Sequence, residues 1–462
     1  MSALVLRRAE VDGAPVDVRI EGGMVSALGA AGSMGGADVV IDCGGGALLP
    51  GLHDHHLHLL SMAAMAESVD VSRDLDRAIA SAHRSAPPGA PIRAVHYDEV
   101  EEGPLDRWRL DALAPGRPVR VQHRSGALWV LSTAALEQVG ARDASEPGVE
   151  RDHLDRPTGR LFRLDSWLRE RMPRQAPPDL AAVGRRLASC GVTGVTDCTP
   201  AASSEYFAPI ADAVRSGALP VTVTVTGAPA LSAVRPPPPL RRGPVKVIIA
   251  DQALPPLDEV CRSMAEAHRA GRAVAVHCVT RSGLWLAIAG WRAVGPAPGD
   301  RVEHASVTPP EAVAALCALG VTVVTQPAFL AVRGDAYLAE VEPADQPDLY
   351  RCASLLEAGV PVGGSTDAPF GPDDPWCAIR CAVERRAPSG ERVGSDRGLD
   401  PARAMALFLG PPERPGGPAR RVAPGAPADL CLLDVPLRTA LLEPSRRHVA
   451  MTIAAGRLTY EA

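Results

Sequence analysis

The sequence PGLHDHHLH at residues 50–58 ends an apolar run and carries four histidines. Side chains of a β-strand alternate between its two faces, so Asp54, His56 and His58 share one face and the other two histidines take the opposite one. Two imidazoles two residues apart at a strand end can bind the same metal ion, and neutral imidazole is the commonest protein ligand for zinc. The alternative, a histidine-rich surface loop, stays open at this point.

Outward from residues 50–58, further short apolar runs follow one another along the chain, and the stretches between them are long enough for helices. This alternation is typical of a parallel (β/α)8 barrel, with helices that often end at a glycine. We therefore predict an α/β fold with a distorted TIM barrel, in which helices include 256–270, 309–319 and 349–358 and strands cover 47–58, 192–198, 220–227, 245–249, 273–278, 301–304, 321–326 and 361–367.

More ligand-type residues stand at the ends of the later predicted strands. His277 ends the fifth, His304 the sixth and Asp367 the eighth. The carboxyl ends of barrel strands meet on the catalytic face. A lone histidine in such a place is more often a hydrogen-bonded structural residue, but three such residues together with His56 and His58 are better explained by a metal site.

Lys246 is the single lysine among the 48 lysines and arginines of the chain, and it lies in the apolar fourth strand. Arginine cannot replace a modifiable amine, so a lysine that persists in an arginine-rich chain indicates a need for that amine. Carboxylation by carbon dioxide would make Lys246 an anionic ligand able to bridge two metals. Its alternatives are a buried salt bridge or a side chain that extends to solvent.

The first two predicted strands are separated by far more than one helix. Residues 60–180 contain further strand-like runs, and an unstructured loop of this length would be unusual. We predict an insertion subdomain over the barrel mouth. Both chain ends also have strand patterns, which predicts one composite β-sandwich from 1–46 and 419–462 beside a barrel domain of 47–418.

The composition, with 46% hydrophobic and 22% charged residues, is that of an ordinary globular enzyme. A net charge of −6 argues against a nucleic-acid partner. The first residues lack the long apolar run of a signal peptide, and no stretch approaches the roughly 20 apolar residues of a membrane helix. Ten scattered cysteines suit a reducing compartment. We expect a cytoplasmic protein that binds a small-molecule substrate; a homodimer stays open.

These motifs resemble the amidohydrolase superfamily and, within it, the YtcJ-like branch that includes N-substituted formamide deformylase. PGLHDHHLHL (50–59) is similar to the family's PGxxDxHxH element, VKVIIAD (245–251) to VKxxxDG, and GSTDAP (364–369) to GSDAP. The second strand, the insertion and the closing strand PGAPADLCLLD (424–434) are also similar, so the resemblance covers nearly the whole chain.

The resemblance implies one or two divalent metals, with zinc expected, in a hydrolase. Asp367 would also accept the proton of the attacking water. The implied ligands are His56, His58 and Asp367 for the more buried metal, His277 and His304 for the more exposed one, and carboxylated Lys246 as the bridge.

The sequence departs from the family pattern at three places. Gln252 replaces a glycine, Thr366 replaces a serine, and Gly126-Ala127 stands where a histidine is often found. The last change weakens the transfer of a substrate from relatives, but none of the three removes an implied metal ligand.

The favoured function is hydrolysis of an amide, formamide or cyclic amide C–N bond. The alternatives are ester hydrolysis, heterocycle deamination, decarboxylation or isomerisation on the same fold, and a non-catalytic metal-binding protein. Structural roles are at least as well supported as substrate contacts for a further group of candidates, namely His123, Arg124, Trp129, Gln326 and Arg351.

Overall fold

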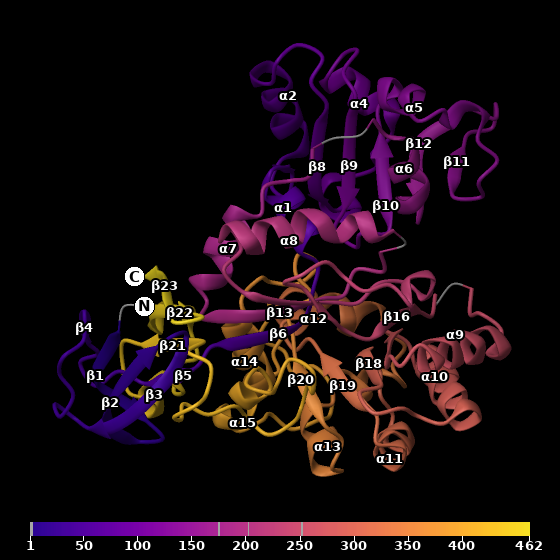
Figure 1. The fold of residues 1–462 in the computed structure, drawn as a ribbon. Coiled ribbons are helices and arrows are strands. Elements are labelled where there is room, and N and C mark those ends of the chain that lie inside the picture. Colours follow the sequence, from indigo (N-terminus) through magenta and orange to yellow (C-terminus); the bar gives the residue numbers. More distant parts are fainter. Residues whose placement is uncertain (1–2, 174–175, 202, 251–252) are drawn as a thin grey trace. The chain divides into compact units, whose positions relative to one another are not determined.

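The computed structural model describes residues 3–173, 176–201, 203–250 and 253–462. The chain forms two compact units, one of Met1–Leu59 with Leu180–Ala462 and the other of Leu60–Asp179 (Figure 1). Each unit has its own sheets and its own buried core.

Two parallel sheets form the centre of the first unit. In one, the order β15-β14-β13-β6 joins Arg241–Arg242, Thr222–Val225, Val192–Asp197 and Leu52–Leu57. In the other, the order β16-β17-β18-β19-β20 joins Val245–Ile248, Val274–Cys278, Arg301–His304, Thr322–Thr325 and Val362–Gly364. The α/β prediction is confirmed.

Backbone hydrogen bonds connect the edges of these two parallel sheets. The Asp367 amide, just after β20, donates to the His56 carbonyl on β6 at 2.8 Å. The Lys246 amide on β16 donates to the carbonyl of Gly227, just after β14, also at 2.8 Å. The first contact joins β6 to the segment after β20, and the second joins β16 to the segment after β14.

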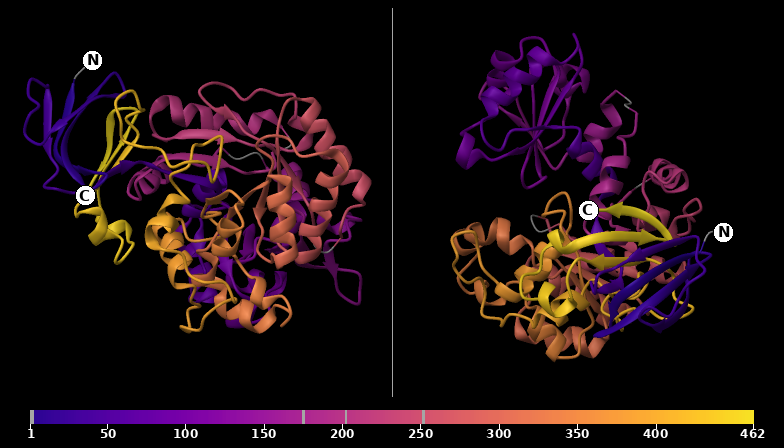
Figure 2. Two further views of the ribbon diagram at one scale, coloured as in Figure 1. Left: turned by 90° about the horizontal axis from the view of Figure 1, so that it is seen from below. Right: turned by 90° about the vertical axis from the view of Figure 1, so that its left-hand side faces the viewer.

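Helices follow most of the parallel strands along the chain, and Figure 2 shows further views of these helices and strands. Their ends follow local chemistry: Thr280 caps the helix after β17 by accepting a hydrogen bond from the Gly283 amide, and Gly320 ends the helix after β18 with a left-handed φ of +66°. The helices are α7 (Ala181–Ala188), α8 (Phe207–Ser216), α9 (Leu257–Arg269), α10 (Arg281–Val294), α11 (Pro310–Leu319), α12 (Phe329–Glu340), α13 (Cys352–Glu357), α14 (Pro375–Glu384) and α15 (Pro401–Ala406).

The predicted single strand over 47–58 is wrong, because the structure has two strands there. β5 (Leu48–Pro50) pairs antiparallel with β21 (Leu430–Leu433), whereas β6 pairs with β13 in a different sheet. Gly51 lies between them, and a Cβ at this position would be 2.2 Å from the Thr193 side chain. The chain changes sheets where only glycine fits.

The two chain ends form two further sheets of the first unit. One has the order β3-β2-β1-β4, from Met24–Ala30, Ala14–Glu21, Leu4–Val11 and Val39–Asp42; the other has the order β23-β22-β21-β5, with β22 at Val449–Ala454 and β23 at Arg457–Glu461. Both sheets contribute to one buried cluster, which includes Leu6, Val18, Leu432 and Ile453.

The second unit is built on one mixed sheet of order β11-β12-β10-β9-β8-β7. Its strands are Val149–Arg151, Pro157–Phe162, Leu128–Leu131, Val119–His123, Ile92–Tyr97 and Val69–Asp70, and its helices are α1 (starting at Leu59 and ending at Ala66), α2 (Leu75–Ser85), α3 (Glu99–Glu102), α4 (Arg107–Leu113), α5 (Thr133–Gln138) and α6 (Asp165–Arg171). Alternate residues of β8, β9 and β10 pack with α2 and α4 in one core, for example Ala94, Val121 and Val130.

A transmembrane helix is not found within the described ranges, since none of the helices there combines the length and the apolar character that crossing a bilayer requires.

Candidate metal centre

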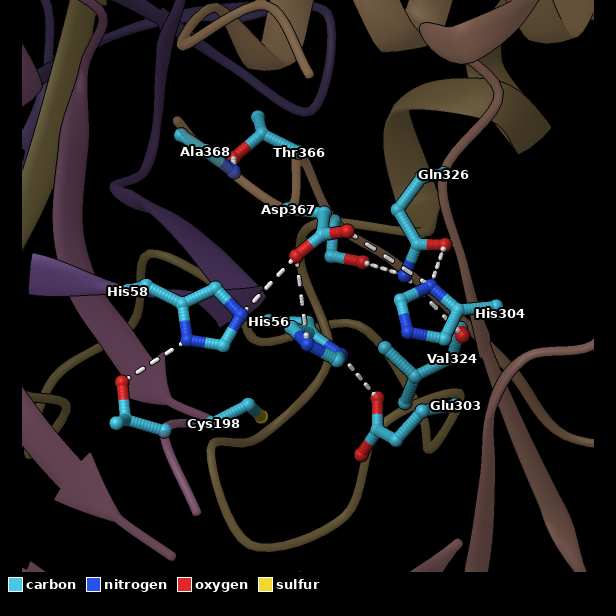
Figure 3. A network of polar contacts seen from close by, with 12 residues as sticks. His56, His58, Cys198, Glu303, His304, Val324, Gln326, Thr366, Asp367 and Ala368 are labelled. Atoms are coloured by element: carbon cyan, nitrogen blue, oxygen red, sulfur yellow. Dashed lines mark hydrogen bonds and ion pairs between the residues drawn. The ribbon is translucent and has the colours of Figure 1, made fainter. Parts of the chain in front are cut away.

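Two histidines at the end of β6 and an aspartate beyond β20 form the centre of the site (Figure 3). Asp367 Oδ1 is 3.2 Å from His58 Nε2 and 3.5 Å from His56 Nε2. Each of the three side chains offers a ligand atom, and these atoms all lie within 4.8 Å of one another. The set therefore has the size of a metal-binding group.

The other ring nitrogen of each histidine near Asp367 has a hydrogen-bond partner. Nδ1 of His56 is 2.5 Å from a Glu303 carboxylate oxygen, and Nδ1 of His304 is 2.8 Å from the side-chain oxygen of Gln326. Because both oxygens are acceptors, these rings carry their proton on Nδ1 and keep a lone pair on Nε2. Nδ1 of His58 is 2.9 Å from the Thr199 hydroxyl.

His56 presents an unprotonated ring nitrogen to Asp367. Burial, together with Lys246 and His58, lowers the pKa of His56 well below its usual range, so the ring is neutral. Asp367 Oδ1 is buried and has no hydrogen-bond partner among the described residues. An imidazole lone pair beside a buried carboxylate oxygen is unfavourable unless a cation lies between them. The donor set therefore fits a divalent metal bound by nitrogen and oxygen.

The remaining predicted ligands lie in the same place. The Nζ atom of Lys246, on β16, is buried and 3.4 Å from His56 Nε2. The ring of His304, at the end of β18, is 4.8 Å from the ring of His56 and 4.5 Å from that of His277 on β17, measured between centroids. The structure thus brings all six predicted ligands together, from β6, β16, β17, β18 and the segment after β20.

Comparison with known proteins gives the family. The sequence profile described as the amidohydrolase family matches residues 39–460, which is most of the chain. This chain belongs to the amidohydrolase family. Its members are metal-dependent, and the six clustered side chains provide this family member with candidate metal-binding groups.

Individual relatives agree with this assignment. The chain is 25% identical to N-substituted formamide deformylase of Arthrobacter pascens, over 96% of this chain and 94% of that one. Its structure is similar to an uncharacterized metal-dependent hydrolase of Pyrococcus horikoshii, with a TM-score of 0.77, 20% identity, and coverage of 94% and 97%. N-isopropylammelide isopropylaminohydrolase of Burkholderia multivorans gives a TM-score of 0.55 at 16% identity, with coverage of 99% and 98%.

Sequence reasoning missed an ion pair behind the amidohydrolase site. Glu303 is fully buried, and its second carboxylate oxygen accepts a hydrogen bond from Arg301 Nε at 2.6 Å. Arg301 is also buried. A signal was present in the sequence RVEHAS, because a glutamate and an arginine in a strand of buried residues need partners.

A second possible ligand group, made of His56, Cys198 and Glu303, does not have the character of a metal site. Arg301 Nη2 lies 3.4 Å from Cys198 Sγ, while its Nε donates to Glu303. The guanidinium therefore already provides the positive charge at this point. Burial also raises the pKa of the Cys198 thiol, which keeps the sulfur protonated.

The backbone is left-handed at two of the predicted ligands. His304 has a φ of 72° and Asp367 a φ of 55°, and Ala305 follows with 48°. Such conformations cost about 1–3 kcal/mol each for residues other than glycine and are found mainly at functional sites. The turn at His304 interrupts the strict alternation of side chains, so that both Glu303 and His304 reach the neighbourhood of His56.

Thr366, which replaces the family's usual serine, keeps the role of a hydroxyl at this position. Its Oγ1 donates to Asp54 Oδ2 at 2.5 Å, and Asp54 also accepts a hydrogen bond from the His56 amide at 3.1 Å. Burial raises the pKa of Asp54 to about 7. Asp54 thus ties the end of β6 to the segment that carries Asp367.

Two candidate substrate contacts of the first unit have partners within the fold. Gln326 is fully buried, and its amide is used by His304, by the Ser365 hydroxyl at 2.9 Å and by the Val324 carbonyl. Arg351 binds Asp348 at 3.0 Å beside α13. Gln326 thus positions His304, and Arg351 forms a largely buried ion pair with Asp348; a substrate contact by either residue stays a prediction.

The other three candidate contacts lie in the second unit. His123 is 2.8 Å from the Ser125 hydroxyl, Arg124 forms an ion pair with Asp98, and Trp129 donates to Asp165 at 2.9 Å. All these partners belong to the same unit. Their role in substrate binding stays a prediction, as does that of the departure at Gly126-Ala127; Gln252 lies outside the described residues.

Proposed function

We propose that this protein is a metal-dependent hydrolase that cleaves the C–N bond of a small amide, with an N-substituted formamide or a cyclic amide as the preferred class. One observation carries the proposal: ring nitrogens of His56 and His58 converge on a buried Asp367 oxygen that has no hydrogen-bond partner among the described residues. The choice of a C–N bond is supported by the name of the Arthrobacter relative.

The six clustered residues would hold one or two zinc ions. A bound zinc ion supplies Lewis acidity, which lowers the pKa of water and polarises a carbonyl oxygen. We assign the more buried ion to His56, His58 and Asp367, the more exposed one to His277 and His304, and the bridge to carboxylated Lys246.

Lys246 is suited to carboxylation because its amine is buried beside a neutral imidazole nitrogen. The neutral amine attacks carbon dioxide, forms an N–C bond and releases one proton, which leaves an anionic carbamate. This charge would compensate for divalent cations in a site where burial keeps the pKa values of His56 and His304 well below their usual range. The lone lysine of the chain would thereby acquire the oxygen ligands that arginine cannot supply.

Asp367 is placed to move the proton during hydrolysis. Its carboxylate would accept the proton of the attacking water as the oxygen bonds to the carbonyl carbon, and would then donate that proton to the departing nitrogen as the C–N bond breaks. The products are a carboxylic acid and an amine. The Phe370 ring lies edge-on to His58, with centroids 5.5 Å apart, and gives the site an apolar wall.

We further propose that the two parallel sheets are the halves of one distorted (β/α)8 barrel and that the two end sheets form a β-sandwich. The hydrogen bonds from Asp367 to His56 and from Lys246 to Gly227 support closure of the barrel. The shared core of the end sheets supports the sandwich. The proposed domains are 1–46 with 419–462, and 47–418 with an insertion of about 60–180, except that β5 (Leu48–Pro50) belongs to an end sheet.

A cytoplasmic location and a small-molecule substrate complete the proposal, and a homodimer is compatible with it. None of the ten cysteines forms a disulfide in the described structure, as a reducing compartment would favour. Turnover of a panel of N-formyl, N-acyl, lactam and ester compounds would identify the substrate class; exclusive turnover of esters would overturn the choice of a C–N bond.

Removal of His58 should lower the metal content. Purified wild-type protein should contain one or two transition-metal ions per chain, and His58→Ala should lose at least one of them because the buried group of three ligands is reduced to two. Elemental analysis after gel filtration measures this. His448→Ala is the matched control, since His448 pairs with Asp434 near the C-terminus. Equal metal contents in both variants would contradict the assignment.

A further inference from the structure

We infer that Glu303 is a positioning residue that fixes the His56 ring and sets the metal affinity of the site through its negative charge. The inference rests on the proposed metal-dependent function. It concerns a residue that contacts His56 at Nδ1, on the side of the ring away from the proposed metal, and does not touch the reacting atoms.

The carboxylate of Glu303 is divided between two partners. Oε2 accepts the proton of His56 Nδ1 at 2.5 Å, and Oε1 accepts from Arg301 Nε at 2.6 Å. The side chains of His56 and Glu303 are 1% and 0% exposed, so water does not compete for these bonds. Hydrogen bonds to an ionised carboxylate are stronger than those between neutral groups, most of all in a buried place.

The ion pair between Arg301 and Glu303 uses a single hydrogen bond. Arginine–carboxylate pairs frequently form two parallel hydrogen bonds, which would occupy both carboxylate oxygens. Here the Nη2 atom of Arg301 is directed to the His55 carbonyl and to Cys198 Sγ, both at 3.4 Å, and only Nε reaches Glu303. Arg301 thus pairs with one oxygen of the carboxylate and leaves the other available for His56.

His56 differs in this respect from the other anchored histidines. His58 contacts a hydroxyl of Thr199 and His304 contacts an amide oxygen of Gln326, and both partners are neutral. The charged partner of His56 fixes the tautomer of the ring and increases the electron density on Nε2. This is the ring nitrogen of His56 that faces Asp367 and Lys246. His56 would therefore be a stronger imidazole donor than His58 and His304.

The test compares Glu303→Gln with wild type, using Co²⁺ as the probe. The amide keeps the size of the side chain and removes its charge. Competition with a chelator should show Co²⁺ affinity weaker by about 10–100-fold, the usual effect of losing such an outer partner. The visible absorption of bound Co²⁺ should also shift, because the donor strength of His56 changes. A structural defect alone would not move this band.

Asp300→Asn is the matched control. Asp300 is a buried carboxylate just before β18 that accepts hydrogen bonds from Trp291 Nε1 at 2.9 Å and the Val274 amide at 2.8 Å. Its loss should lower thermal stability and leave the Co²⁺ affinity and spectrum unchanged. Should Glu303→Gln fail to fold, Glu303→Asp keeps the charge but draws it back from Nδ1, and should still weaken Co²⁺ binding.

Unchanged affinity and spectrum in a folded Glu303 variant, with Co²⁺ bound normally by wild type, would overturn the inference and leave the proposed function intact. A wild-type protein that binds no Co²⁺ would instead overturn the proposed function itself.

Discussion

Asp367→Asn is expected to lower kcat by about 10²–10⁴-fold, the usual contribution of a general base, while the protein stays folded. Asparagine has the same shape and can still offer an oxygen to a metal, but it cannot accept the proton of water. The backbone at this position is held by the hydrogen bond from the Asp367 amide to the His56 carbonyl at 2.8 Å, which the substitution preserves. Much of the metal should therefore remain.

The measurement uses the best substrate from the amide panel, with circular dichroism and elemental analysis on the same samples. Asp396→Asn is the control, since Asp396 is a buried carboxylate that accepts the Ala353 amide at 2.8 Å and has no role in the proposed site. Its kcat should stay near that of wild type. Retained turnover in Asp367→Asn would reject the assignment of the base.

Lys246→Ala should remove the bridge and lower both metal content and turnover, the latter by at least about 10²-fold. The amine lies 3.4 Å from His56 Nε2, so its loss leaves a buried gap beside the ligands. Lys246→Arg restores a positive charge without a carboxylatable amine and should be equally defective. Unaltered metal content in both variants would contradict a bridging role.

Carboxylation itself can be observed directly because the chain has a single lysine. Wild-type protein exchanged into ¹³C-labelled bicarbonate should give a carbamate carbon resonance that is absent from Lys246→Ala. The N-terminal amine is the other possible source, and it is present in both proteins. A resonance that persists in the variant would place the carbamate elsewhere.

The cost of the left-handed backbone at His304 and Asp367 is a physical clue to the function. Both residues lie just at or after strand ends, where neighbouring hydrogen bonds hold them. The Asp367 amide bonds to β6, and the His304 ring bonds to the buried Gln326. The fold thus stores local strain in order to direct two ligand side chains to the same point.

The sequence by itself determined the α/β class and the positions of the predicted ligands, because carboxyl ends of parallel strands meet at one edge and ligand-type residues stood at those ends. It also singled out Lys246, since composition alone isolates it. The family resemblance, carried by motifs such as GSTDAP, was likewise readable from the chain. These are features of single strands and of their order.

Only the tertiary structure decided which groups stand behind the ligands. The pairing of Glu303 with His56 joins residues 247 positions apart, and Gln326 reaches His304 from the next strand. Strand alternation could not predict that Glu303 and His304 both approach His56, because it assumes a regular backbone and the φ at His304 is positive. The break at Gly51 also depends on a distant side chain, that of Thr193. Local patterns fix where a strand ends, whereas contacts across the sheet fix how its last residues are held.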